Sequence, residues 1–171
     1  EGLYGVLLNG AGRPEDAVEL MTDLQRRFPG AAFGTGPLMR GLEEVGRLDE
    51  ALEMRRAFHG RFPGVTEALD EGFAAGGYPE AMARAAERMA ELYGGEIFVS
   101  ALDIVDLNAE AGRLDEAMRW LRVAVEQRDP NVPYLGVAHS LRPLHDHPGF
   151  RELVEEIGFE IHVPDSGGGR P

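Results

Sequence analysis

The chain has 171 residues, 43% of them hydrophobic, which is enough for one domain with a proper core. Its formal net charge of −13 disfavours nucleic acids and anionic membrane surfaces as partners, because binding to either depends on basic patches. Cysteine and lysine are absent, which excludes disulfides, thiolate nucleophiles, a P-loop lysine and a Schiff-base lysine.

One sequence pattern occurs four times along the chain: residues typical of a helix end are followed by acidic residues typical of the start of the next helix. AGRPEDAVEL at 11–20 returns as VGRLDEALEM at 45–54, more loosely as AGGYPEAMAR at 75–84, and as AGRLDEAMRW at 111–120. The glycines at 12, 46, 76 and 112 are 34, 30 and 36 residues apart. Self-similarity at a nearly fixed period indicates a helical repeat.

Each copy predicts two helices joined by a tight turn. The glycine, such as Gly12, ends the first helix in a left-handed conformation, and acidic residues at the start of the second helix suit its dipole. A small residue, such as Ala17, then lets the two helices cross closely. First helices are expected at 1–11, 37–45, 65–75 and 96–111, with Leu3, Tyr4, Leu7 and Leu8 as the apolar residues of the earliest.

A period of 34, two helices per copy and a Pro near the end of a copy resemble the tetratricopeptide repeat. The resemblance implies an all-α fold, a right-handed α-solenoid of about four antiparallel helix pairs with a C-terminal capping helix. Repeats are expected at 1–30, 31–64, 65–95 and 96–130, within one domain over 1–163. The family has a small residue in the first helix. Gly5 supplies it in the first repeat, whereas larger residues stand at the equivalent positions of the other three, so those helix pairs are expected to pack further apart. These residues are Met39, Leu69 and Val105.

Residues 98–159 resemble, more particularly, the C-terminal repeat regions of bacterial multi-domain regulators. Such regions follow winged-helix transcription factors, nucleotide cyclases and kinases. The shared elements are RDP at 128–130, a shortened turn RPL at 142–144 and a partial match PGF at 148–150. The chain also lacks an initial Met, so we expect it to be a piece of a longer protein.

A last helix is predicted to cover the end of the stack. The family has a capping Asp where this chain has His147, and Asp146 is the alternative cap if the helix begins one residue earlier. Gly158 is expected to end the helix. The capping segment is expected at 131–163, with 164–171 a disordered tail. The apolar face of the last helix consists of Phe150, Leu153, Val154 and Ile157.

Few residues suggest chemistry. His145 and His147 form the only local cluster that suggests a metal, but a spacing of two does not place both rings on one helix face, and a polar turn is the alternative. Paired acids such as Glu43 and Glu44 are expected on solvated helix faces, and no nucleophile elbow surrounds a serine. We therefore predict no catalytic residue, metal or cofactor, and no enzyme activity.

The family resemblance implies that the first helix of each pair lines a concave groove. Without lysine, a clamp for a peptide carboxylate is not expected, and an acidic lining favours a basic or amphipathic protein segment. The alternative is that the groove binds nothing specific and that the stack is a spacer or a homodimerisation surface. By register, the partner-binding residues are Arg40, Glu44, Asp70, Phe73, Leu102, Asp106 and Glu110.

We therefore expect a non-enzymatic protein–protein interaction scaffold, the C-terminal repeat region of a larger bacterial regulatory or signalling protein. One alternative is a substrate-recognition or dimerisation module of an enzyme whose catalytic domain lies upstream, and another is a metal-dependent activity at His145 and His147. The sequence has no signal peptide and no apolar run long enough to span a membrane, and the lack of cysteine suits a reducing compartment. A cytoplasmic location is therefore expected.

Overall fold

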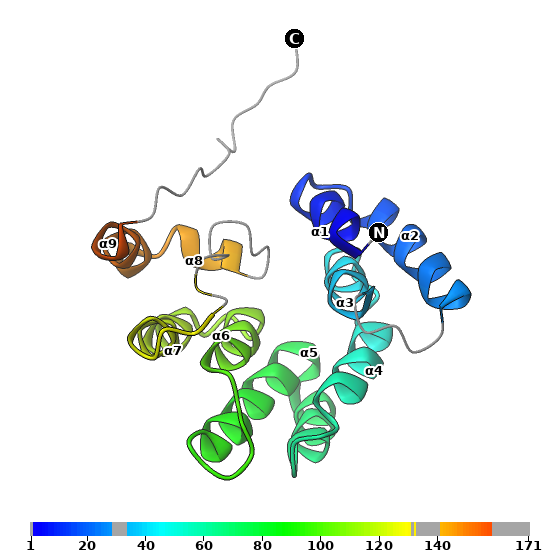
Figure 1. Cartoon of the computed structure of the whole chain (residues 1–171). Coiled ribbons are helices and arrows are strands. Elements are labelled where there is room, and N and C mark those ends of the chain that lie inside the picture. The colour runs from blue at the N-terminus through cyan, green and yellow to red at the C-terminus, as the bar shows by residue number, and fades with distance from the viewer. Residues whose placement is uncertain (1, 29–33, 131, 133–140, 159–171) are drawn as a thin grey trace. The chain divides into compact units, whose positions relative to one another are not determined.

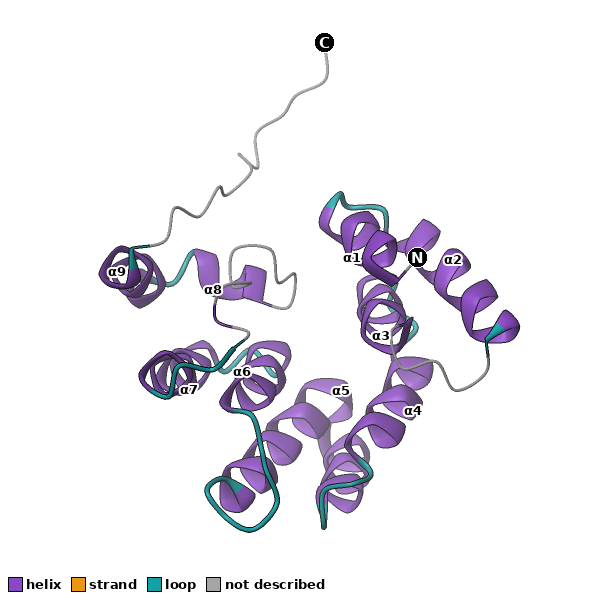
Figure 2. Ribbon diagram, viewed as in Figure 1, coloured by secondary structure: helices purple, strands orange, loops and turns teal. Residues whose placement is uncertain are grey.

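A computed structural model of the chain describes residues 2–28, 34–130, 132 and 141–158. The regular elements in these residues are all helices, which confirms the predicted all-α class (Figures 1 and 2). The chain divides into two compact units, Glu1–Val99 and Ser100–Pro171, and each is described by itself. None of the helices in the described ranges is long and apolar enough to cross a bilayer.

The first unit holds α1 (Gly2–Gly10), α2 (Pro14–Arg27), α3 (Thr35–Glu44), α4 (Leu48–His59) and α5 (Val65–Leu92). Each helix packs against the next one along the chain, and α1 also packs against α3. Apolar side chains at helical spacing form the core between them, as the period predicted. Its most buried members include Met21, Leu24, Leu42, Leu52, Leu69, Met82 and Met89.

Three of the predicted turns have the same hydrogen-bond pattern. After α1, Gly12 has φ +70°, its amide donates to the Asn9 carbonyl at 3.0 Å, and the Arg13 amide donates to the Leu8 carbonyl at 2.9 Å. The same two bonds and the same positive φ recur at Gly46 and Gly112. This Schellman arrangement satisfies the last carbonyls of the helix, so the predicted role of these glycines is confirmed.

A fully buried alanine follows each of these turns at the point where the second helix begins. Ala17, Ala51 and Ala117 have no exposed surface, and the amide of each donates to the carbonyl of the Arg that precedes its helix. The sequence predicted a small residue at a helix contact here, and the alanine is fully buried in all three turns.

The third copy differs, because α5 consists of two helical arms joined across Gly76 and Gly77. The positive φ, +73°, falls on Gly77 rather than on Gly76, which the repeat alignment had favoured. Gly72 in the first arm lies so near the second that a Cβ there would be 2.6 Å from the Ala81 Cα. The expectation of wider packing at Leu69 is thus wrong, because the close approach lies three residues further along.

The second unit holds α6 (Ala101–Glu110), α7 (Leu114–Glu126), α8 (Arg142–His145) and α9 (Pro148–Ile157). Helix α7 packs against the other three. Helix α6 begins five residues later than the predicted residue 96, because the Ser100 hydroxyl accepts from the Leu102 amide at 3.1 Å and caps the helix there. That hydroxyl also donates to Asp129 Oδ2 at 2.8 Å, close to the end of α7. In the first unit, α3 begins at Thr35, two residues before the predicted start at Pro37.

Helix α9 has the predicted apolar face, with Phe150, Leu153 and Val154 buried, and ends at Gly158, whose φ is +71°. Its cap is His147 and not Asp146, because His147 Nδ1 accepts from the Gly149 amide at 3.1 Å. The remaining parts of the predicted capping segment, 131, 133–140 and 159–163, and the predicted tail 164–171 lie outside the described residues. The single domain over 1–163 stays a prediction.

Candidate functional site

Four predicted groove residues lie on α3 and α5. Arg40 is largely buried, and its Nη1 lies 3.0 Å from Glu43 Oε2. Asp70 Oδ1 accepts from Arg56 Nε at 2.6 Å, which links α5 to α4. Glu44 is exposed and Phe73 is half-buried. Arg40 and Asp70 are therefore engaged in ion pairs within the first unit.

The other three predicted groove residues lie on α6 in the second unit. Leu102, Asp106 and Glu110 are half-buried and four residues apart, so they share one face of that helix. A continuous groove over both units, lined by all seven residues, stays a prediction.

A buried polar cluster in the first unit was missed at the sequence level. Arg55 of α4 donates from Nε and Nη2 to Oε1 of Glu43 on α3, at 3.0 and 2.8 Å. The hydroxyl of Tyr78, in the second arm of α5, donates to the same carboxylate oxygen. The expectation that Glu43 lies on a solvated face is wrong, because only 5% of its side chain is exposed.

Burial determines the protonation of this cluster. Desolvation raises the pKa of Tyr78 above its ordinary value, and the negative charge of Glu43 adds to the effect. The hydroxyl therefore stays protonated and able to donate to the carboxylate. The cluster joins α3, α4 and α5, and its three side chains are almost fully buried, which indicates a structural role.

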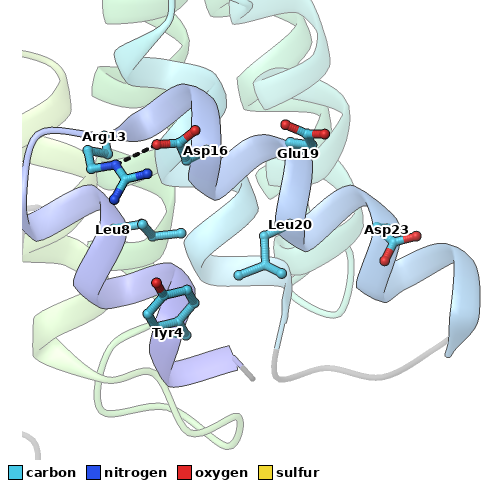
Figure 3. Close-up of a pocket in the computed structure, with 7 residues that line it drawn as sticks. All are labelled: Tyr4, Leu8, Arg13, Asp16, Glu19, Leu20 and Asp23. Carbon is cyan, nitrogen blue, oxygen red and sulfur yellow. Dashed lines mark hydrogen bonds and ion pairs between the residues drawn. The ribbon is translucent and has the colours of Figure 1, made fainter.

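A hollow of about 320 Å³ lies between α1 and α2. Figure 3 shows Tyr4 and Leu8 of α1 on one side of the hollow and Leu20 of α2 on the other. The predicted apolar residues of α1 do not all enter the core. Leu8 is buried, whereas Leu3, Tyr4 and Leu7 are 73%, 55% and 59% exposed. Burying such a side chain fully stabilises by about 1.5–3 kcal/mol, so this face gains if something covers it.

Carboxylates line the α2 side of the same hollow. Asp16, Glu19 and Asp23 lie along one face of α2, and Arg13 is the one lining residue of opposite charge (Figure 3). Arg13 Nε donates to Asp16 at 2.5 Å, and Asp23 pairs with Arg27. Two features of the sequence indicate this site. The apolar residues of α1 cover a wider arc than contact with a core requires, and on α2 the three acids are spaced three and four residues apart, which places them on one helix face.

The two histidines near α8 lie in different environments. His147 Nε2 lies 3.0 Å from Asp115 Oδ1, and His147 Nδ1 accepts a hydrogen bond from the Gly149 amide. Because an accepting ring nitrogen carries no proton, the ring proton is on Nε2. The His145 ring stacks on Phe150 with 4.9 Å between ring centres. Burial lowers the pKa of His145, and the charge of Arg142 lowers it further. Within the described ranges, no three His, Asp or Glu side chains come together as a metal site.

Three comparisons with known proteins were made, and no family model, curated protein or solved structure matches the chain.

Proposed function

We propose that the chain is a non-enzymatic interaction scaffold built from tetratricopeptide-like helix pairs, and that it serves a larger bacterial regulatory or signalling protein. The repetition of one turn carries the proposal. Gly12, Gly46 and Gly112 have the same φ sign and the same pair of hydrogen bonds, and each is followed five residues later by a fully buried alanine. Repeated helix pairs of this kind build extended binding surfaces.

The side-chain chemistry of the described residues also supports binding rather than catalysis. In their most buried charged cluster, Arg55 and Tyr78 both bond to Oε1 of Glu43, and the side chains of Arg55 and Glu43 are only 1% and 5% exposed. The accessible hollow at α1–α2 combines apolar side chains with surface carboxylates, which suits protein contact.

Affinity capture with the full chain as bait, followed by sedimentation velocity of the purified chain, tests the proposal. We expect a specific protein partner, or self-association, that is lost when Glu44 and Phe73 on the predicted groove face are changed to Arg and Ser. A chain that captures no protein and sediments as a monomer at tens of micromolar, a usual range for transient complexes, would contradict it.

A further inference from the structure

We propose that the hollow between α1 and α2 docks a basic amphipathic helix of a partner protein. The proposal rests on the scaffold function above and adds one binding surface to the predicted groove, together with the chemistry of the partner that it would bind. Two properties of this surface support it, one apolar and one electrostatic.

The apolar part is an exposed arc on α1. Leu3, Tyr4 and Leu7 are all more than half exposed, and they lie within five consecutive residues. On an α-helix these positions adjoin one another and lead to Leu8, which lines the hollow. Single exposed apolar residues are ordinary on protein surfaces, but a contiguous group beside a hollow marks a site for another apolar surface.

The electrostatic part lies on α2. Asp16, Glu19 and Asp23 share a helix face by their spacing, and in the described residues Glu19 has no ion pair. The pairs of the other two, with Arg13 and Arg27, are exposed, and exposed pairs contribute little to stability. A basic side chain of a partner can therefore replace either arginine at small cost.

A helix with apolar residues at i, i+3, i+4 and i+7, flanked by arginine or lysine, matches both parts. Its apolar face would cover the α1 arc, and its basic edge would lie along the α2 carboxylates. A second copy of this chain fits less well, because two such surfaces would bring their carboxylates together and each copy carries a net charge of −13.

Fluorescence anisotropy with three labelled peptides of about 16 residues, long enough to become helical on binding, tests the proposal. The first peptide has leucines at the four stated positions and arginines on the flanks. The second has glutamates in place of the arginines, and the third has serines in place of the leucines. We expect only the first to bind the full chain, with an affinity that falls as salt is added.

Four variants locate the binding. Glu19→Arg and Tyr4→Ser change exposed positions of the hollow, and each should raise Kd about tenfold or more. Their matched controls are Glu155→Arg, an exposed acid on α9, and Phe98→Ser, an exposed aromatic outside the hollow. The controls should leave Kd within about twofold of the parent. Unchanged helix content by circular dichroism accompanies each measurement.

Four results would overturn the proposal, and the last of them leaves the scaffold function intact. The first is no binding of the leucine–arginine peptide. The second is an equal loss of affinity in Glu19→Arg and Glu155→Arg, which would mean attraction by overall charge alone. The third is self-association that Tyr4→Ser abolishes, which would make a second copy the occupant. A partner captured by the full chain and retained by Tyr4→Ser and Glu19→Arg would leave the scaffold function standing while removing this surface.

Discussion

Arg55 on α4 and Glu43 on α3 form a buried ion pair, with two hydrogen bonds of 3.0 and 2.8 Å to one carboxylate oxygen. Their side chains are 1% and 5% exposed. Each charge is tolerated because the other lies against it and because the Tyr78 hydroxyl donates a further bond to the carboxylate. The ion pair therefore joins α3 to α4 within the second helix pair, and the Tyr78 hydroxyl links that pair to α5.

Removing one member of this pair should destabilise the chain strongly. Glu43→Gln removes the negative charge that lies against the buried guanidinium of Arg55, and the free energy of unfolding should fall by about 3–5 kcal/mol in urea denaturation. The double variant Glu43→Leu with Arg55→Met should lose less than Glu43→Gln alone, because it removes the buried Arg55 charge together with its partner. A double variant that loses more would contradict this account of the cluster.

The exposed pair of Arg47 and Glu50 is the matched control. Glu50→Gln makes the same chemical change on the surface of α4, where water screens both charges. Its denaturation midpoint should stay close to that of the parent, so the contrast with Glu43→Gln measures the effect of burial.

Tyr78 should titrate only when the chain unfolds. Its pKa lies above the ordinary value of 10.0, so the unfolded chain releases this proton near pH 10 while the folded chain keeps it. Stability from this group is therefore complete below pH 10 and is lost as the pH rises further. In an alkaline ultraviolet titration, the last phenolate should appear together with the loss of helical circular dichroism. A Tyr78→Phe variant should lack that phase, and its persistence would assign it to another tyrosine.

Gly72→Ala should disrupt the close approach within α5. The added Cβ would lie 2.6 Å from the Ala81 Cα and from the Glu80 carbonyl oxygen, and backbone atoms cannot give way as a flexible side chain can. We expect a loss of about 1–3 kcal/mol in thermal or urea unfolding. Gly10→Ala at the end of α1 is the control, since no atom beyond its chain neighbours and its own helix backbone lies within 4 Å of a Cβ there, and alanine favours a helix. It should be neutral or stabilising.

Arg128→Gly should stabilise the end of α7. Arg128 has φ +52° and repeats the hydrogen-bond pattern of the glycine turns, with its amide donating to the Val125 carbonyl and the Asp129 amide to the Ala124 carbonyl. Glycine adopts this conformation without the strain of a Cβ, so we expect a gain of about 0.5–1 kcal/mol and a higher Tm. The converse change, Gly112→Ala, should lower Tm by a similar amount. An unchanged Tm in both variants would contradict the strain argument.

The second unit should lose stability in mild acid through His145. Its folded pKa lies below the ordinary 6.5, so as the pH falls through 6.5 the unfolded chain takes up a proton that the folded chain does not. The stability contribution is therefore complete above pH 6.5 and declines below it. His145→Phe keeps a ring against Phe150 and removes the titration. The difference in Tm between this variant and the parent should grow between pH 7 and pH 5, whereas a constant difference would exclude the mechanism.

Short-range features were predictable from the sequence because a few neighbouring residues determine them. The helix stops at Gly12, Gly46 and Gly112 depend on hydrogen bonds that span five residues or fewer. The apolar face of α9 and its end at Gly158 were predictable for the same reason, since helical spacing alone places those side chains together.

The candidate site was only partly predictable. Asp70 was expected to face a partner protein, but in the structure it forms an ion pair with Arg56, which lies 14 residues earlier in the sequence. The apolar residues of α1 were visible, yet their exposure depends on which neighbours cover that helix. A spacing pattern gives the relative directions of side chains on one helix and says nothing about which direction ends in solvent.

The sequence by itself determined the helices, the repeated turns and the small residues at the helix crossings. Tertiary structure alone decided that Glu43 is buried, since the hydroxyl that meets it comes from Tyr78, 35 residues later. Tertiary structure also decided that the third helix pair approaches most closely at Gly72, and that His147 contacts Asp115, which lies 32 residues away in the sequence. Burial and ion pairing are sums over neighbours distant in sequence, and only the packed chain brings those neighbours together.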